Sequence, residues 1–243
     1  MVEDHDPVPL PISEAGGAGR LPDARSVREA GLPGYAELHC VSNFSFLRGA
    51  SHPEELVERA QALGYTALAL TDECSLAGVV RAHLKARELG LHLIVGTELR
   101  VDTPDSPAGF FTLVLLAGHR RGYGQLCELI TAARARADRK GHYAVSLADL
   151  RALPPDALDD TLALLAPRRE TDTPLQHGAS FESILAAASW LRATFADRAW
   201  LAVELLHRLD DALWLHKLRE IARLCGLPLV ATGQVLMRFE ARA

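Results

Sequence analysis

The chain is poor in cysteine and contains no long apolar run. Its four cysteines are spread over 243 residues, and no two of them form a C-x-x-C pair. A zinc knuckle and a disulfide framework both need paired cysteines, so the sequence argues against either and favours a reducing compartment. No stretch approaches the roughly 18 apolar residues of a membrane span, and the acidic start MVEDHD lacks the basic segment of a secretion signal. We therefore expect a cytoplasmic protein with no membrane partner.

An excess of positive charge is also missing. The formal net charge is -5 and the sequence pI is about 6.1, so no overall positive field attracts a polyanion such as DNA. The sequence has no glycine-rich loop followed by Lys and Ser or Thr, and no G-x-S-x-G motif. P-loop nucleotide hydrolysis and acyl transfer are therefore without support.

Short apolar runs alternate with amphipathic ones along most of the chain. Residues 1–34 carry several prolines and a GGAG run, a composition that predicts a flexible leader outside the fold. Residues 35–243 are predicted to form one α/β domain. Its seven predicted strands are the β-prone runs at 35–40, 66–72, 91–101, 110–117, 161–167, 199–206 and 227–235.

Helical patterns separate most of these strands. Ser51, with Glu54 three residues later, predicts a capping box at the start of the first helix, and Gly90 and Gly226 predict helix C-terminal caps. Because parallel strands need crossover helices, the alternation favours a β/α barrel or a doubly wound sheet of parallel strands. The other predicted helices lie at 75–90, 123–138, 180–197 and 211–226, and the predicted loops at 153–160 and 167–178.

Donor side chains lie at the carboxyl ends of several predicted strands, where an α/β barrel builds its site. One imidazole and several carboxylates on one rim are what a multinuclear hydrolytic metal site needs. A histidine at a strand end also fits a structural hydrogen bond, and Asp72 also fits a cap of the next helix. Spacing alone favours the structural interpretation over the metal site. The residues concerned are His39, Asp72, Glu73, Glu98, Glu204, His207 and Gln234.

Two basic clusters could contact a nucleic-acid backbone. At helical spacing beside Asp138, the larger cluster is typical of a solvated helix end, and we interpret the smaller one in the same way. The larger cluster consists of Arg134, Arg136, Arg139 and Lys140, and the smaller one of His119, Arg120 and Arg121.

Three motifs in a fixed order carry a resemblance to a known family. LHCVSNFSFLRGASHPEELVERAQALGY, ALALTDECSLAGVVRAHLKARELG and LIVGTEL together resemble the polymerase and histidinol phosphatase (PHP) domain at the N-terminus of bacterial C-family DNA polymerases. Among these they most resemble the error-prone relatives of the polymerase III alpha subunit. The similarity covers about residues 35–235, and LPLVATGQVLM resembles the closing strand. It implies a distorted (β/α)7 barrel of the PHP type.

The resemblance also implies a metal site whose ligand positions are poorly filled here. His39, Glu73 and Glu98 match ligand positions and are expected to be vestigial ligands. Five other positions have lost the histidine or acid of the family. Valine and leucine have no donor atoms, and an arginine adds a positive charge, so the resemblance implies a degenerate site. The five replacements are Val41, Arg48, Thr112, Gln234 and Leu236.

The resemblance sets the functional expectation. We expect the N-terminal domain of an error-prone DNA polymerase that acts in damage-tolerant (translesion) replication, with Mg²⁺ as cofactor of the full-length enzyme. This segment would be a catalytically inactive structural domain without a cofactor. Its implied partners are the polymerase core and, through the full-length protein, DNA, the sliding clamp and other translesion factors.

Two alternatives remain open from the sequence. The first is a residual metal-dependent phosphoesterase or 3'-5' proofreading exonuclease that uses His39, Asp72, Glu73 and Glu98. The second is a free-standing protein-interaction module.

Overall fold

Seven strands form one sheet whose spatial order is the order of the sequence. The computed structural model describes residues 34–103, 109–169 and 179–237. The predicted leader lies outside these residues apart from Gly34, as do positions 170–178 of the predicted loop. The strands are β1 (Ala36–Cys40), β2 (Ala67–Leu70), β3 (His92–Asp102), β4 (Phe110–Ala117), β5 (Thr161–Ala166), β6 (Ala199–Val203) and β7 (Leu229–Ala231).

The sheet closes on itself between its first and last strands. Cys40 forms a parallel bridge with Val235, and the Val41 N–H donates to the Val235 carbonyl at 2.8 Å. In return, the Val235 N–H donates to the His39 carbonyl at 2.9 Å. The prediction of a seven-stranded α/β barrel is therefore confirmed.

One strand departs from the expected parallel arrangement. β4 pairs antiparallel with both β3 and β5, whereas the pairs β1–β2, β2–β3, β5–β6 and β6–β7 are parallel. The reason is the short link at 103–109, because a parallel crossover needs about a dozen residues or more. Among the described residues, β4 is the element that follows β3, and its direction is reversed.

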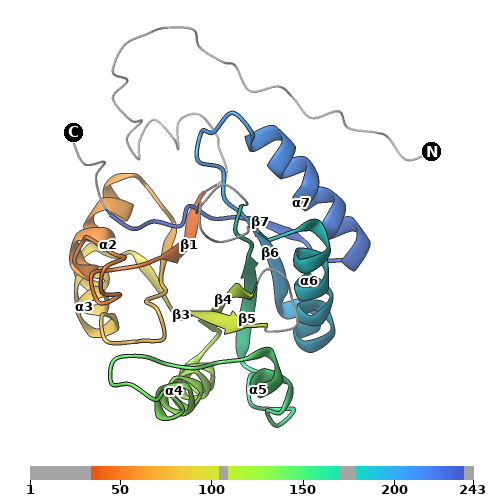
Figure 1. Cartoon of the computed structure of the whole chain (residues 1–243). Helices are drawn as coiled ribbons and strands as arrows, with labels where there is room; N and C mark the ends of the chain where they lie inside the picture. The colour runs from red at the N-terminus through yellow and green to blue at the C-terminus, as the bar shows by residue number, and fades with distance from the viewer. Residues whose placement is uncertain (1–33, 104–108, 170–178, 238–243) are drawn as a thin grey trace, which may run out of the picture.

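The helices lie around the outside of the barrel (Figure 1). Gly90 and Gly226 have φ of 69° and 68° at the ends of α3 and α7, as predicted for glycine caps. None of the helices in the described ranges is both long and apolar enough to span a membrane. The helices are α2 (Pro53–Ala62), α3 (Val79–Leu89), α4 (Arg120–Ala135), α5 (Leu147–Arg151), α6 (Phe181–Phe195) and α7 (Asp211–Cys225), and a short 3-10 turn covers Ala196–Arg198.

The capping box of α2 lies one residue later than predicted. His52 is the N-cap, and its backbone N–H donates to the Glu55 carboxylate at 2.9 Å. Pro53 occupies the first helical position, where its fixed φ and missing N–H cost nothing. Because proline favours this position, the capping box is formed by His52 and Glu55 and not by Ser51 and Glu54.

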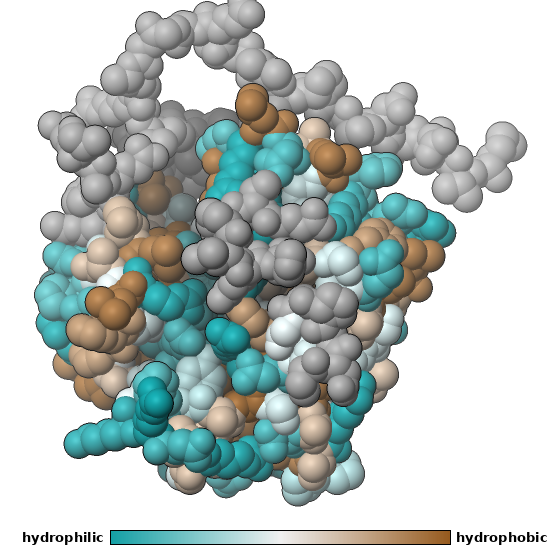
Figure 2. Space-filling model, viewed as in Figure 1, coloured by the Kyte–Doolittle hydropathy of each residue, from teal (hydrophilic) through white to brown (hydrophobic). Residues whose placement is uncertain are grey.

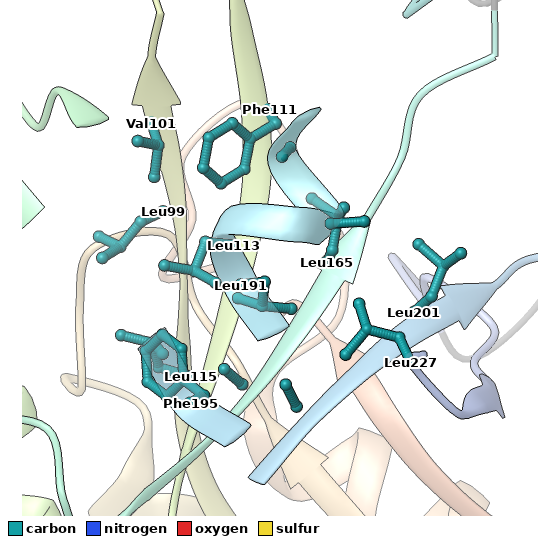
Figure 3. Close-up of a cluster of buried hydrophobic side chains, with 14 of the residues drawn as sticks. Leu99, Val101, Phe111, Leu113, Leu115, Leu165, Leu191, Phe195, Leu201 and Leu227 are labelled. Atoms are coloured by element: carbon teal, nitrogen blue, oxygen red, sulfur yellow. The ribbon is translucent and has the colours of Figure 1, made fainter. Parts of the chain in front are cut away.

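Apolar side chains fill both the interior of the barrel and the layer beneath the helices. Within β3, Leu99 and Val101 face the helices, so the alternating residues Glu98 and Arg100 face the interior. Figure 3 shows the outer layer, in which strand residues pack against Leu191 and Phe195 of α6. The interior cluster is formed by Ala69, Val114, Leu116, Leu164, Ala166 and Ala202. Since apolar residues fill the middle, the polar side chains of the interior face can meet water only at an end.

Candidate functional site

Polar side chains gather at the carboxyl end of the barrel. A cavity of about 440 Å³ opens there. The strand ends converge as expected from the sequence, and His39, Glu73, Glu98 and Glu204 belong to one hydrogen-bonded network that includes Arg48. The cavity is lined by Arg48, Glu73, Glu98, Arg100, Phe110, Thr112, Ala166, Pro167, Arg168, Glu204, Leu206, Arg208 and Gln234.

His39 lies between two carboxylates. Its Nε2 is 2.7 Å from Glu98 Oε2, and its Nδ1 is 2.9 Å from Glu204 Oε1. The imidazole is 0% exposed and Glu98 is 2% exposed. The two ring nitrogens point in different directions, so the two carboxylates flank the ring and do not converge on one point beside it. Each carboxylate can accept a hydrogen bond from the ring nitrogen that faces it.

Arg48 reaches into the site from the loop after β1. Its guanidinium donates to Glu73 Oε2 at 2.9 Å and forms a short contact with Glu98 Oε1. Tyr143 donates its hydroxyl to the other oxygen of Glu73 at 2.7 Å. Burial and the adjacent Glu73 carboxylate raise the pKa of the Tyr143 phenol, which keeps it a donor. The positive partner of these acids is therefore a protein side chain.

Asp72 binds the loop after β1 and does not cap the helix that follows it. It accepts the Ser42 N–H at 2.8 Å, the Ser42 hydroxyl at 2.7 Å and the Ser45 hydroxyl at 2.8 Å. The helix that follows it, α3, begins after Gly78, so the capping interpretation is wrong. Asp72 is 1% exposed and fastens the loop after β1 onto the end of β2.

Three of the five replaced ligand positions, Arg48, Thr112 and Gln234, line the cavity. Val41 is fully buried. The Leu236 carbonyl accepts the Ala50 N–H at 2.8 Å. His207 lies on the exposed loop after β6 and does not join the network around His39.

Arg134 has a structural role that sequence analysis missed. Its guanidinium donates to the Cys74 carbonyl at 3.0 Å and to the Gly141 carbonyl at 3.0 Å. It thereby holds Cys74 at a φ of 46°, next to Glu73. The interpretation as a solvated helix end is wrong for Arg134 but fits Arg139 and Lys140, which are exposed. No local pattern marks this contact, because its partners lie far away in the sequence.

Arg169 is a second residue that the sequence did not single out. It is 5% exposed and donates to Asp210 at 3.1 Å, to Asp211 at 2.5 Å and to the Glu204 carbonyl at 2.9 Å. It links the end of β5 to the end of β6 and so fixes the strand end that carries Glu204. In the sequence, the arginine pair at 168–169 directly after an apolar run is the feature that could have indicated this role.

The smaller basic loop is paired with acids. His119 Nε2 is 2.7 Å from Asp160 Oδ1, and Arg121 is 3.1 Å from Asp160 Oδ2. Arg136, from the larger cluster, lies 3.7 Å from Asp149. These ion pairs support the structural interpretation of both clusters.

Glu37 is a buried acid below the rim that the sequence did not single out. Its carboxylate accepts from the Tyr35 hydroxyl at 2.9 Å, the His39 N–H at 2.8 Å and the Gly233 N–H at 3.0 Å. Burial raises the pKa of Glu37 in spite of these donors. Glu37 therefore links β1 to the segment after β7, and the contribution of this link to the free energy of unfolding depends on pH.

We expect a Glu37→Gln substitution to change the pH dependence of stability. A raised pKa in the folded state favours folding below the unfolded pKa, and this benefit is lost as pH rises through the folded pKa. The variant lacks this loss, so its stability relative to the parent chain should increase between pH 5 and pH 8. Urea unfolding of both proteins at the two pH values measures the difference. A constant difference would contradict the assignment.

The donor set does not fit a metal cluster. Within residues 34–103, 109–169 and 179–237, no group of three or more His, Cys, Asp or Glu side chains is arranged to hold a metal ion. In addition, Arg48 occupies the space between Glu73 and Glu98, and both ring nitrogens of His39 contact carboxylates. A divalent ion would have to displace a guanidinium and a proton to bind.

Comparisons with known proteins agree with the fold. The PHP domain model matches residues 37–205. The structure is similar to a candidate metal-dependent phosphoesterase from Bifidobacterium adolescentis, with a TM-score of 0.59, 15% identity, and coverage of 86% of this chain and 90% of that chain. It is also similar to an amidohydrolase from Chromobacterium violaceum, with a TM-score of 0.61, 18% identity, and coverage of 83% and 87%.

Relatives with high sequence identity are much longer proteins. The chain is 52% identical over 212 residues to the error-prone DNA polymerase of Dechloromonas aromatica, which covers 87% of this chain and 19% of that protein. It is 50% identical over 217 residues to the error-prone DNA polymerase of Bordetella parapertussis, with 87% and 20% covered. The chain thus spans about a fifth of these relatives. With its closed barrel, its rim motifs and a family match over most of its length, the chain belongs to the PHP domain family.

Proposed function

We propose that this chain is the N-terminal barrel of an error-prone DNA polymerase and serves as a structural domain, with residues 35–243 as the barrel and 1–34 as a leader. Support comes from the half-identical relatives, all named as error-prone DNA polymerases. The longer protein would add nucleotides on a DNA template during translesion synthesis in the cytoplasm. DNA, the sliding clamp and other translesion factors would be partners of that protein.

The observation that carries the structural role is the position of Arg48. A PHP barrel that works as a phosphoesterase places cations among the acids of its rim, and here a guanidinium contacts two of them. A guanidinium is always charged and, unlike a bound ion, it is covalently attached to the chain and cannot dissociate. The network therefore holds Glu73, Glu98 and His39 together without an ion, which stabilises the barrel and leaves none of these three side chains free to activate water.

Within this proposal the chain performs no chemical step. Mg²⁺ would bind to acids of the remaining part of the longer polymerase and supply the charge stabilisation for nucleotide addition. His39, Glu73 and Glu98 would contribute only to the stability of the rim. The barrel would act by its shape and by the surface that it presents to that remaining part.

Calorimetry and activity measurements on the isolated chain test this role. We expect no stoichiometric heat on titration with Mn²⁺, no hydrolysis of p-nitrophenyl phosphate and no primer extension. Stoichiometric Mn²⁺ binding that disappears in a Glu98→Ala variant, with hydrolysis that follows the chain through purification, would instead establish the metal-dependent phosphoesterase or exonuclease. Primer extension that scales with the concentration of the chain would also contradict the proposal.

A further inference from the structure

Large apolar side chains are exposed on three neighbouring segments at the carboxyl end of the barrel. Phe46 and Leu47 are 85% and 89% exposed, and Leu209 is fully exposed. We call the set the apolar rim surface. It includes most of the exposed large hydrophobic side chains in the described residues. Its members are Phe44, Phe46 and Leu47 after β1, Leu205, Leu206 and Leu209 after β6, and Met237 after β7.

These three segments lie side by side. β6, β7 and β1 are consecutive around the barrel, and neighbouring strands are about 4.8 Å apart. The Ala50 N–H donates to the Leu236 carbonyl at 2.8 Å, which ties the first segment to the last. Leu206, Arg48 and Gln234 line the same cavity. Figure 2 shows hydrophobic atoms protruding over the loop that leads into α7.

Each of the three segments holds one non-glycine residue at positive φ. The values are 64° for Leu47, 55° for His207 and 48° for Gln234. Such conformations cost free energy, persist only where the surroundings enforce them, and gather at functional sites. Folding alone would favour glycine or asparagine at position 47. A leucine there presents a bulky apolar side chain to solvent.

The loop after β1 is held rigidly in this shape. Asp72 binds Ser42 and Ser45, and Arg48 is fixed by Glu73 and Glu98. Gly49 is so close to the loop backbone that an added Cβ would lie 1.9 Å from the Ser42 carbonyl oxygen. Exposed apolar side chains on a preorganised loop can bind a partner without an ordering cost. This favours a docking surface over incidental exposure.

We propose that the apolar rim surface is where the remaining part of the longer polymerase docks. The inference depends on the proposed function, because the occupant is that part of the protein. The chain spans about a fifth of its relatives, so the remaining part is large. The described chain leaves the barrel at Met237, on this surface, so a segment that follows is tethered beside it at high effective concentration. Apolar side chains do not bind phosphates, which argues against DNA as the occupant.

Hydrogen exchange on a chimera tests the surface. The chimera carries this chain in place of the matching region of the Dechloromonas aromatica error-prone DNA polymerase. We expect amides of residues 43–49 and 204–210 to exchange at least ~10-fold more slowly in the chimera than in the isolated chain. A Phe46→Ser/Leu47→Asn double substitution should abolish this slowing. The isolated double variant should melt no lower than the parent, because asparagine tolerates the φ of position 47.

A matched control uses apolar residues that are exposed elsewhere. Val80 and Leu84 are 68% and 63% exposed on α3, and a Val80→Ser/Leu84→Ser variant should keep the slowing at the rim. Slowing at α3 in place of the rim would overturn the docking surface while the structural role remains. Equal slowing in the concentrated isolated chain would identify a second copy as the occupant. Slowing that disappears when residues 1–33 are deleted would identify the leader. Either result overturns the proposal.

The proposed function fails in a different way. If the chimera extends primers equally well with the barrel cleaved off and no surface of the barrel is protected, the structural role itself is refuted. If the barrel is required for extension but residues 43–49 and 204–210 stay unprotected, only the docking surface is refuted.

Discussion

An Arg48→Ala variant should be less stable than the parent chain by about 2 kcal/mol. Removing one partner of a buried ion pair typically costs about 3–5 kcal/mol because the other charge stays buried and unpaired. Glu98 is 2% exposed but Arg48 is 35% exposed, so solvent screens part of the effect and the expected loss lies below that range. Urea unfolding followed by circular dichroism measures the change.

Two further measurements identify the cause of this loss. A Glu98→Gln substitution made together with Arg48→Ala should restore most of the stability, because it removes the unpaired charge. Mn²⁺ should stabilise the Arg48→Ala variant but not the parent chain, by about 1.4 kcal/mol at ten times its dissociation constant. Glu73 and Glu98 are then free to bind the ion. A parent chain that gains as much stability from Mn²⁺ as the variant would contradict our assignment of Arg48 as the resident cation.

An Asp72→Ala variant should lose about 3 kcal/mol, because three buried donors lose their acceptor. These donors are the backbone N–H and hydroxyl of Ser42 and the hydroxyl of Ser45. Thermal or urea unfolding gives the magnitude. Hydrogen exchange should also quicken across residues 43–49, because Asp72 fastens that loop.

The matched control for Asp72 is Asp72→Asn. The amide keeps one acceptor oxygen, so this variant should lose about half as much stability as the alanine variant. If Asp72 were instead a metal ligand, both variants would lose Mn²⁺ binding and neither would free the loop. An alanine variant whose stability matches that of the parent chain would refute the fastening role.

The strands were predictable from the sequence, but their ends and one direction were not. All seven predicted runs contain a strand, since buried strands are near-continuous apolar runs. The predicted strand at 199–206 runs past β6, which ends at Val203. Leu205 and Leu206 extended the apolar pattern although they are exposed, and hydropathy alone cannot separate an exposed leucine from a buried one. The antiparallel direction of β4 could be predicted only from the shortness of the link at 103–109.

The site was predictable as a set of donors, but not as a network. His39, Glu73, Glu98 and Glu204 meet because the carboxyl ends of barrel strands share one rim. The resemblance singled out Arg48 as a lost ligand, but its pairing with two acids required the three-dimensional structure. Such contacts join residues that are distant in the sequence, and no periodicity marks them.

The seam between β1 and β7 determines when this barrel can be completed. Its bonds join His39 and Val41 to Val235, residues from opposite ends of the domain. On the ribosome, β1 emerges long before its partner, and its free edge stays unpaired until Val235 has left the exit tunnel. An unpaired edge invites pairing with another nascent chain. Synthesis that stalls just before β7 should therefore leave a product that aggregates or is degraded, although nearly the whole sheet is already present.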